Sequence, residues 1–106
     1  MSEIKVLTDK AGNPVDIESH MVIQQVSRAS DDKINEVAKN ACIAECEKTV
    51  KGWNNSPGGS SFKFVDVTNV RITNGQSFTH QEPWPSNKRT WEYTANPVCN
   101  LMYTEV

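Results

Sequence analysis

Apolar and polar residues alternate in short runs at the start of the chain. Residues 1–17 are predicted to form a hairpin or a loose N-terminal arm, because apolar residues flank a turn-rich segment with Gly12, Asn13 and Pro14. Residues 21–26 are few and rich in β-branched side chains, which favours a strand over a helix. The first quarter of the chain is therefore expected to supply strands.

The longest amphipathic segment follows and predicts a helix from Ser30 to about Lys51. Ser30 is suited to cap the helix, and Asp31 and Asp32 suit the positive end of the helix dipole. Gly52 is a natural stop after the last turn. The apolar stripe expected to face a sheet consists of Ile34, Val37, Ala38, Ala41, Cys42, Ile43, Cys46 and Val50.

The second half of the chain is rich in aromatic and β-branched residues and predicts further strands. Residues 62–73 carry apolar side chains on both faces, which is typical of a central strand with a helix covering one side. Asn74-Gly75 is a strong reversal signal and is expected to end this strand.

Two more strands are predicted at residues 90–95 and 98–103, and Pro97 between them indicates a bulge or an edge position. The resulting order is β-β-α-β-β-β, an α+β fold with a single helix packed on an antiparallel sheet. Because 106 residues match the size of one domain, residues 1–106 are expected to form a single α+β domain.

Charge is spread along the chain and argues against several classes of function. The net charge is −2, and the densest basic cluster is only Lys88-Arg89. Since nucleic-acid-binding proteins usually carry a basic face, no nucleic-acid partner is expected. No apolar run approaches the ~20 residues that a membrane span needs. No motif indicates a cofactor, a metal or a catalytic site, so an enzyme is not expected.

The chain contains three cysteines, an odd number that allows at most one intramolecular disulfide. Cys42 and Cys46 stand one helical turn apart, and Cys99 lies in the last predicted strand. One interpretation is three reduced thiols that pack as small hydrophobic side chains. The other is a disulfide from the helix to Cys99, which would stabilise the domain by ~3–4 kcal/mol. A helical wheel favours Cys42 over Cys46 as the partner of Cys99.

A metal site and a catalytic histidine have weaker support. Cys42, Cys46 and Cys99 with His80 or His20 would give a Cys3His set, but two cysteines separated by three residues within a helix do not match zinc-knuckle spacing. A base formed by His80, with Glu82 as its orienting partner, would need a pocket that the sequence does not indicate.

Residues 78–89 form the most suggestive functional segment. Trp84 stands between Pro83 and Pro85, and Phe78 precedes them in an otherwise polar stretch. Prolines restrict the backbone, so a tryptophan held between them loses little entropy on docking, and tryptophan is enriched at binding hot spots. The alternative is that Trp84 folds back and covers the open side of the sheet.

These features favour a small, non-enzymatic protein-interaction domain that binds a protein partner. A helix-to-strand disulfide is typical of small domains that act in the periplasm or after secretion. The alternative is a cytoplasmic regulator or inhibitor with reduced thiols, since the first residues lack the apolar core of a signal peptide.

Overall fold

The computed structural model describes residues 3–55 and 61–106 and confirms the α+β class, with one helix packed on an antiparallel sheet. Three strands precede the helix and two follow it, rather than two and three. The elements are β1 (Ile4–Val6), β2 (Asp16–Glu18), β3 (Met21–Gln25), α1 (Asp31–Asn54), β4 (Phe62–Gln81) and β5 (Arg89–Glu105).

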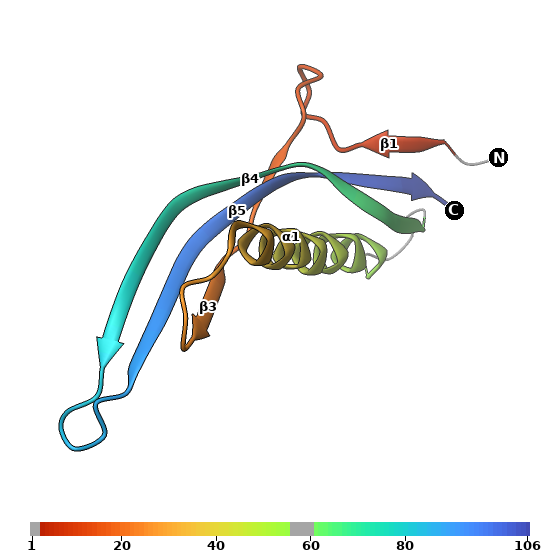
Figure 1. Ribbon diagram of the computed structural model, residues 1–106. Helices are drawn as coiled ribbons and strands as arrows, with labels where there is room; N and C mark the ends of the chain where they lie inside the picture. Colours follow the sequence, from red (N-terminus) through yellow and green to blue (C-terminus); the bar gives the residue numbers. More distant parts are fainter. Residues whose placement is uncertain (1–2, 56–60) are drawn as a thin grey trace.

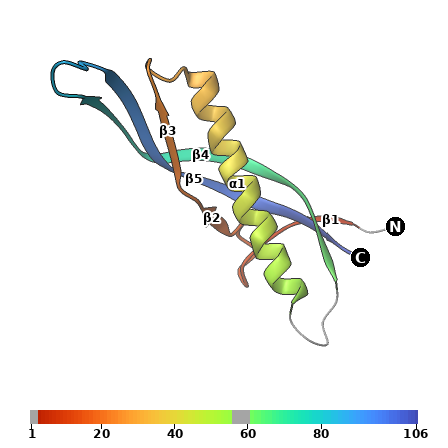
Figure 2. The ribbon, with the colours of Figure 1, turned by 90° about the horizontal axis from the view of Figure 1, so that it is seen from below.

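β5 is the central strand and pairs antiparallel with every other strand of the sheet. β4 runs along one side of β5, while β1, β2 and β3 follow one another along the other side (Figure 1 and Figure 2). The prediction that residues 62–73 form the central strand is therefore wrong, because β4 lies at an edge. Residues 90–95 and 98–103, predicted as two strands, belong to one continuous strand.

β4 bends because it contains more residues than the strand it pairs with. Its 20 residues lie beside the 17 of β5, and the register shifts after Phe64, Thr68 and Thr73. Each shift is a β-bulge, which adds one residue to a strand and bends it. Val65 and Val70 fall in two bulges and are exposed, which explains the apolar residues on both faces of this segment. β4 and β5 curve around α1, which lies on their concave side (Figure 1).

The sequence predicts that Asn74-Gly75 reverses the chain, but the two residues lie inside β4. Asn74 has a φ of 56° and belongs to the third bulge. The left-handed conformation that asparagine tolerates in a tight turn serves here to bend a strand. β4 consequently continues to Gln81, and the connection to β5 shrinks to residues 82–88.

The sequence predicted an edge position or a bulge at Pro97. Pro97 instead lies in the middle of the central strand. The Ser19 N–H donates to the Pro97 carbonyl at 2.8 Å, so the backbone of Pro97 points away from β4. On that side β2 pairs as far as Val98 and β3 begins opposite Ala95. Pro97 therefore faces the break between two short strands, where no strand partner needs the N–H that proline lacks.

The two short N-terminal strands do not pair with each other as a hairpin would. β1 and β2 each pair with β5 instead. The turn itself forms as predicted: the Asp9 carboxylate accepts hydrogen bonds from the N–H groups of Ala11 and Asn13 at 2.9 Å. One bridge joins Thr8 to Pro14.

α1 begins where the sequence predicts but ends one turn later. The Ser30 hydroxyl accepts a hydrogen bond from a backbone N–H of the first turn. At the other end the helix continues through Gly52, because Trp53 packs edge-on against Phe62 and Tyr103, with ring centroids 5.4 and 5.2 Å apart. An aromatic contact worth roughly 1 kcal/mol exceeds or matches the cost of one glycine in a helix.

The apolar stripe of α1 faces the concave side of the sheet and forms two adjacent clusters. The cluster under the C-terminal half of α1 has as its buried members Cys42, Cys46, Val50, Val67, Cys99 and Leu101. The cluster under the N-terminal half has Met21, Ile23, Ala38 and Ala95. The second cluster has fewer buried members, so the larger part of the core lies at the end of the body where Trp53 packs.

The molecule is strongly elongated for its length. Its radius of gyration is 18.0 Å and its extents are 61 × 26 × 23 Å, whereas a compact domain of this size has a radius of gyration of about 13 Å. The elongation comes from the far half of the β4–β5 hairpin, which extends past α1 (Figure 1). We call residues 76–93 the arm and the remainder the body.

We predict that Leu101→Ala lowers the free energy of unfolding by about 3 kcal/mol. Leu101 is fully buried in the larger cluster, so its truncation leaves a cavity. Urea denaturation followed by circular dichroism measures the effect. Met102→Ala, at the neighbouring position on the opposite face of β5, is the matched control and should cost clearly less. Equal losses in the two variants would contradict the assigned facing of β5.

Candidate functional site

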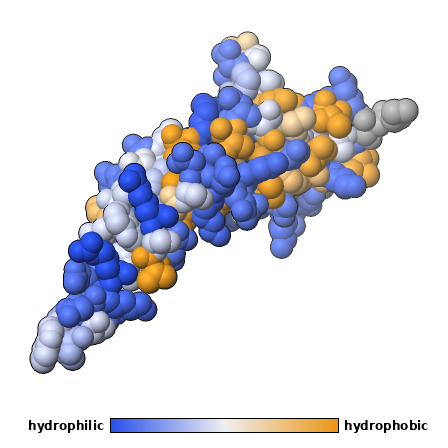
Figure 3. Space-filling view, in the orientation of Figure 1, coloured by the Kyte–Doolittle hydropathy of each residue, from blue (hydrophilic) through white to orange (hydrophobic). Residues whose placement is uncertain are grey.

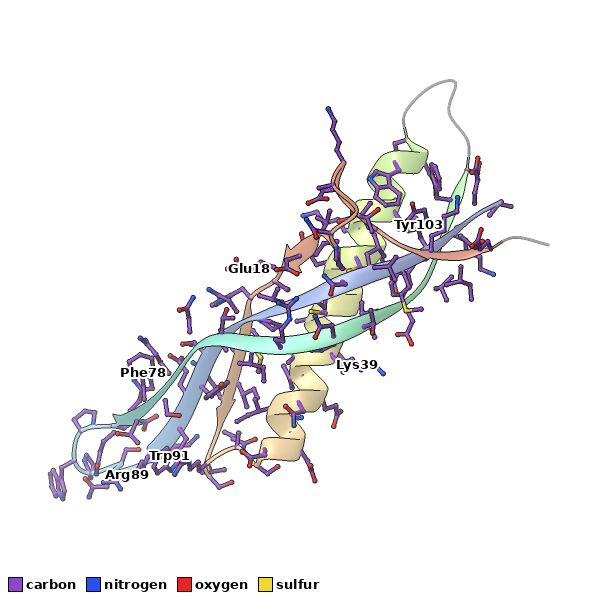
Figure 4. All side chains as sticks on the ribbon, turned by 90° about the horizontal axis from the view of Figure 1, so that it is seen from above. Glu18, Lys39, Phe78, Arg89, Trp91 and Tyr103 are labelled. Atoms are coloured by element: carbon purple, nitrogen blue, oxygen red, sulfur yellow. The ribbon has the colours of Figure 1, made fainter. Side chains whose placement is uncertain are left out.

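The arm is three-stranded at its base, where β3 pairs with Trp91 to Tyr93, and continues beyond β3 as a ribbon of β4 and β5 alone. Beyond the third bulge, Gln76 to Gln81 pair with β5 residue for residue. Figure 4 shows Phe78, Arg89 and Trp91 on this ribbon, far from Tyr103 at the other end of the sheet. Hydrophobic surface gathers over the body, whereas the arm is largely hydrophilic (Figure 3). Since the arm adds little to the core, stability alone does not explain it.

The tip of the arm presents Trp84 to solvent. Trp84 is 82% exposed and Phe78 44% exposed. Trp84 therefore does not fold back over the sheet, which was the alternative interpretation of this segment. The turn is closed by hydrogen bonds from the N–H of Ser86 to the Pro83 carbonyl at 3.2 Å and from the N–H of Glu82 to the carbonyl of residue 88 at 2.8 Å. The structure brings Pro83, Trp84 and Pro85 together in this turn, with Phe78 on the strand below.

A cleft of about 550 Å³ lies where the arm leaves the body. Its walls are β3, the N-terminal turns of α1 and the base of the arm. Apolar side chains from Ile23, Ile34 and Ile72 line it together with the aromatic rings of Trp91 and Tyr93. Polar groups at its rim come from Arg28, Asp31, Asn35 and Ser77. The volume falls within the range of about 300–1,000 Å³ found for small-ligand pockets.

The aromatic residues of this cleft could be found in the sequence, but the cleft itself could not. Trp91 and Tyr93 alternate along one face of a predicted strand, which shows that they share a face but not that the face is uncovered. The cleft exists because the third bulge bends the arm away from α1. That bulge was predicted to be a chain reversal, so the opening was not foreseen.

Close packing of Tyr93 against Gly75 shapes the floor of the cleft. A Cβ atom placed on Gly75 would stand 2.5 Å from the Tyr93 hydroxyl oxygen and 3.3 Å from the ring carbon that bears it. Any residue with a side chain at this position would push the ring into the cleft. The glycine of Asn74-Gly75 is therefore required by a contact across the sheet and not by a turn.

The three cysteines meet at the centre of the body, not in the cleft. All three are buried, and the Cys46 Sγ lies 3.9 Å from the Cys99 Sγ. Burial raises the pKa of the Cys46 thiol to about 12, with the neighbouring Cys99 adding to the shift. Burial likewise raises the pKa of Cys42, and Cys99 contributes there too. Neutral, inaccessible thiols are poor nucleophiles, so this cluster does not resemble a catalytic cysteine site.

His80 contacts Glu92 and not Glu82, the glutamate that the sequence suggested as its orienting partner. His80 Nε2 lies 3.7 Å from Glu92 Oε2 on the exposed surface of the arm, and the Glu82 carboxylate accepts a hydrogen bond from Ser86 instead. His20 Nδ1 contacts Asn96 Oδ1 at 3.1 Å, on the body. Across residues 3–55 and 61–106, no group of three His, Cys, Asp or Glu side chains is placed to hold a metal ion.

A polar network on the convex face ties the N-terminal segment to the sheet. Arg71 Nη2 lies 2.7 Å from Asp16 Oδ1, and the buried Asn100 donates to the same oxygen at 2.9 Å and to the Val15 carbonyl at 3.0 Å. The hydrogen bond from Arg71, followed by that from Asn100, lowers the pKa of Asp16. The network joins β2, β5 and β4, and its role is structural.

Comparison with known proteins adds no further assignment: no family model, no curated protein and no solved structure matches this chain. The helix in the described part of the chain lacks the apolar stretch needed to cross a membrane. Function must therefore be inferred from the arm, the cleft and the cysteine cluster.

We predict that Gly75→Ala displaces Tyr93 and lowers the free energy of unfolding by about 1–3 kcal/mol, the usual cost of overpacking. Tyr93→Phe removes the hydroxyl oxygen that the new methyl group would meet first. The double variant should therefore recover part of the loss. A double-mutant cycle of urea denaturations tests this, and strictly additive losses would contradict the contact.

Proposed function

We propose that this chain is a non-enzymatic protein-interaction domain whose arm and cleft together bind a polypeptide partner. The observation that carries the proposal is the 82% exposure of Trp84 at the tip of an arm that has no core of its own. Exposing a large aromatic ring on a projecting turn has no folding benefit, whereas buried tryptophans dominate the energetics of many interfaces.

Trp84 at the tip and the cleft at the base are the two parts of the candidate surface. Trp91 and Tyr93 lie in the cleft, whereas Phe78 stands opposite Glu92 and therefore points to the other face of the arm. A polypeptide that lies along the cleft side of the arm would contact the exposed Trp84 ring and insert a side chain between the aromatic and isoleucine side chains of the cleft. Such an arrangement of a few large anchors with a polar rim is typical of protein interfaces.

We further propose that the domain acts outside the cytoplasm with Cys46 and Cys99 joined by a disulfide. The 3.9 Å separation of the Cys46 and Cys99 sulfur atoms supports this pair, because these atoms need to approach by only about 2 Å. Two thiols would lose two hydrogens to the disulfide of a thiol–disulfide oxidoreductase, which becomes a dithiol. The high pKa of Cys46 implies that exchange takes place before the core closes.

The alternative is a cytoplasmic regulator or inhibitor in which all three thiols stay reduced. The same burial that raises the thiol pKa values also protects reduced cysteines from oxidation. In that case the interaction surface is unchanged, and only the compartment differs.

We predict that a photo-reactive phenylalanine analogue at position 84 crosslinks a polypeptide partner in cells that produce the protein from its native gene. The exposed tip should be within bonding distance of a bound partner. Mass spectrometry of the crosslinked species identifies it. The same analogue at the exposed Lys39, on the outer surface of α1 (Figure 4), is the matched control and should give no such product.

Purified partner then allows a quantitative test. Trp84→Ala should weaken binding by at least ~30-fold, the loss expected when an interface tryptophan is truncated. Trp91→Ala should also weaken binding, whereas Lys39→Ala should not. Crosslinks that appear equally at positions 84 and 39, or affinity that Trp84→Ala leaves unchanged, would refute the proposed surface.

We predict that protein exported to an oxidising compartment and purified without reductant is lighter than the reduced protein by about two mass units. Cys46→Ala should abolish the difference and Cys42→Ala should retain it. The disulfide closes a loop across a separation of 53 residues, so reduction should lower the free energy of unfolding by about 4 kcal/mol. An unchanged mass in wild-type protein would support the reduced, cytoplasmic alternative.

A further inference from the structure

The outer edge of β4 has no strand beside it in the described part of the chain. A bare strand edge displays unpaired N–H and C=O groups and invites another strand to add. Proteins usually prevent this with charges, prolines or bulges along the edge. The body half of β4 has such protection: Lys63, Asp66 and Arg71 are charged, and all three bulges interrupt the regular backbone before Gln76.

The arm half of the same edge carries none of these protective features. Residues 72–81 contain no Asp, Glu, Lys, Arg or Pro. Residues 76–81 also pair with β5 without a bulge, so their outer edge is a regular strand edge. The contrast between the two halves of one strand indicates that pairing is prevented along the body and permitted along the arm.

The hydrogen-bond pattern shows which backbone groups are available. The Glu82 N–H bonds to the carbonyl of residue 88, which lies directly opposite in the ladder. Since bonded and non-bonded positions alternate in an antiparallel pair, Phe78 and His80 direct their backbone groups toward β5. Ser77, Thr79 and Gln81 therefore direct theirs outward, toward an added strand.

We propose that a second copy of this chain adds to the arm, with the two β4 edges pairing antiparallel about a two-fold axis at Thr79. Ser77 of one copy then lies opposite Gln81 of the other, and Thr79 lies opposite Thr79 of the second copy. This register uses every outward group and forms about six backbone hydrogen bonds. Phe78 and His80 of the two copies face each other on one side of the joined sheet, which covers the partly exposed Phe78 ring.

The chemistry of the edge favours a second copy over a different strand. An interface with two-fold symmetry brings each residue close to its own counterpart, so any charge near the axis would repel itself. An uncharged run from 72 to 81 removes that penalty. A strand from a charged partner would gain no complementary contact here. The paired edge is shorter than a standard interface of about 1,600 Å² requires, so the dimer should dissociate on dilution.

A charge-swap experiment tests the pairing. Thr79 is exposed, so lysine or glutamate can replace it without disturbing the core. Sedimentation equilibrium of the wild-type protein should show a mass that rises with concentration toward twice that of the monomer. Thr79→Lys and Thr79→Glu should each be monomeric, because like charges then meet on the axis. An equimolar mixture of the two variants should form the dimer again.

The mixture separates a specific effect from a folding defect, because two misfolded variants would not restore each other. Asn40→Lys on the exposed outer face of α1 adds the same charge elsewhere and should leave dimerisation unchanged. A wild-type protein that stays monomeric, a dimer that survives both substitutions at Thr79, or a mixture that stays monomeric would each overturn the proposal. In this register position 84 lies opposite residue 74 of the second copy, so a crosslink between two copies of this chain reports the dimer, whereas a crosslink to a different polypeptide reports the partner-binding surface. The two proposals therefore fail independently.

Discussion

The whole fold depends on the pairing of β5 with every other strand. β1, β2 and β3 have at most five residues each, and in the described part of the chain β5 is the strand with which each of them pairs. The face of β5 that carries Cys99 and Leu101 is also the surface on which α1 packs. One strand thus supplies the backbone partners of the sheet and part of the core. The polar network around Asn100 secures the opposite face.

Curvature connects this core to the candidate functional surface. All three bulges lie in β4, so the central strand keeps its regular backbone while the edge strand lengthens and bends. The bend around α1 shapes the body, and the third bulge directs the arm away from it. The cleft and the exposed tip therefore both depend on the third bulge. This bulge contains Asn74, and beside it Gly75 packs closely against Tyr93.

The sequence predicted those parts of the fold that local chemistry determines. The helix start at Ser30, the strand at residues 21–26 and the irregular turn around Trp84 follow from capping, β-branching and proline. The role of β4, the reversal at Asn74-Gly75 and the position of Pro97 were misjudged, because bulges and strand breaks depend on what lies across the sheet. A positive φ is equally compatible with a turn and a bulge. The cleft could not be predicted from the sequence, because it depends on the bend of β4 at the third bulge.

The position of β5 in the chain determines when the sheet can form. β5 follows every other described element in the sequence, yet each of the other described strands pairs with it. During synthesis, α1 can form by itself, but no part of the sheet can assemble until β5 has left the ribosome. Until then the apolar face of α1, with Cys42 and Cys46, has no β5 to pack against. Nascent chains of this protein consequently depend on late, long-range contacts, which is the stage at which chaperones and oxidising enzymes have access to the thiols.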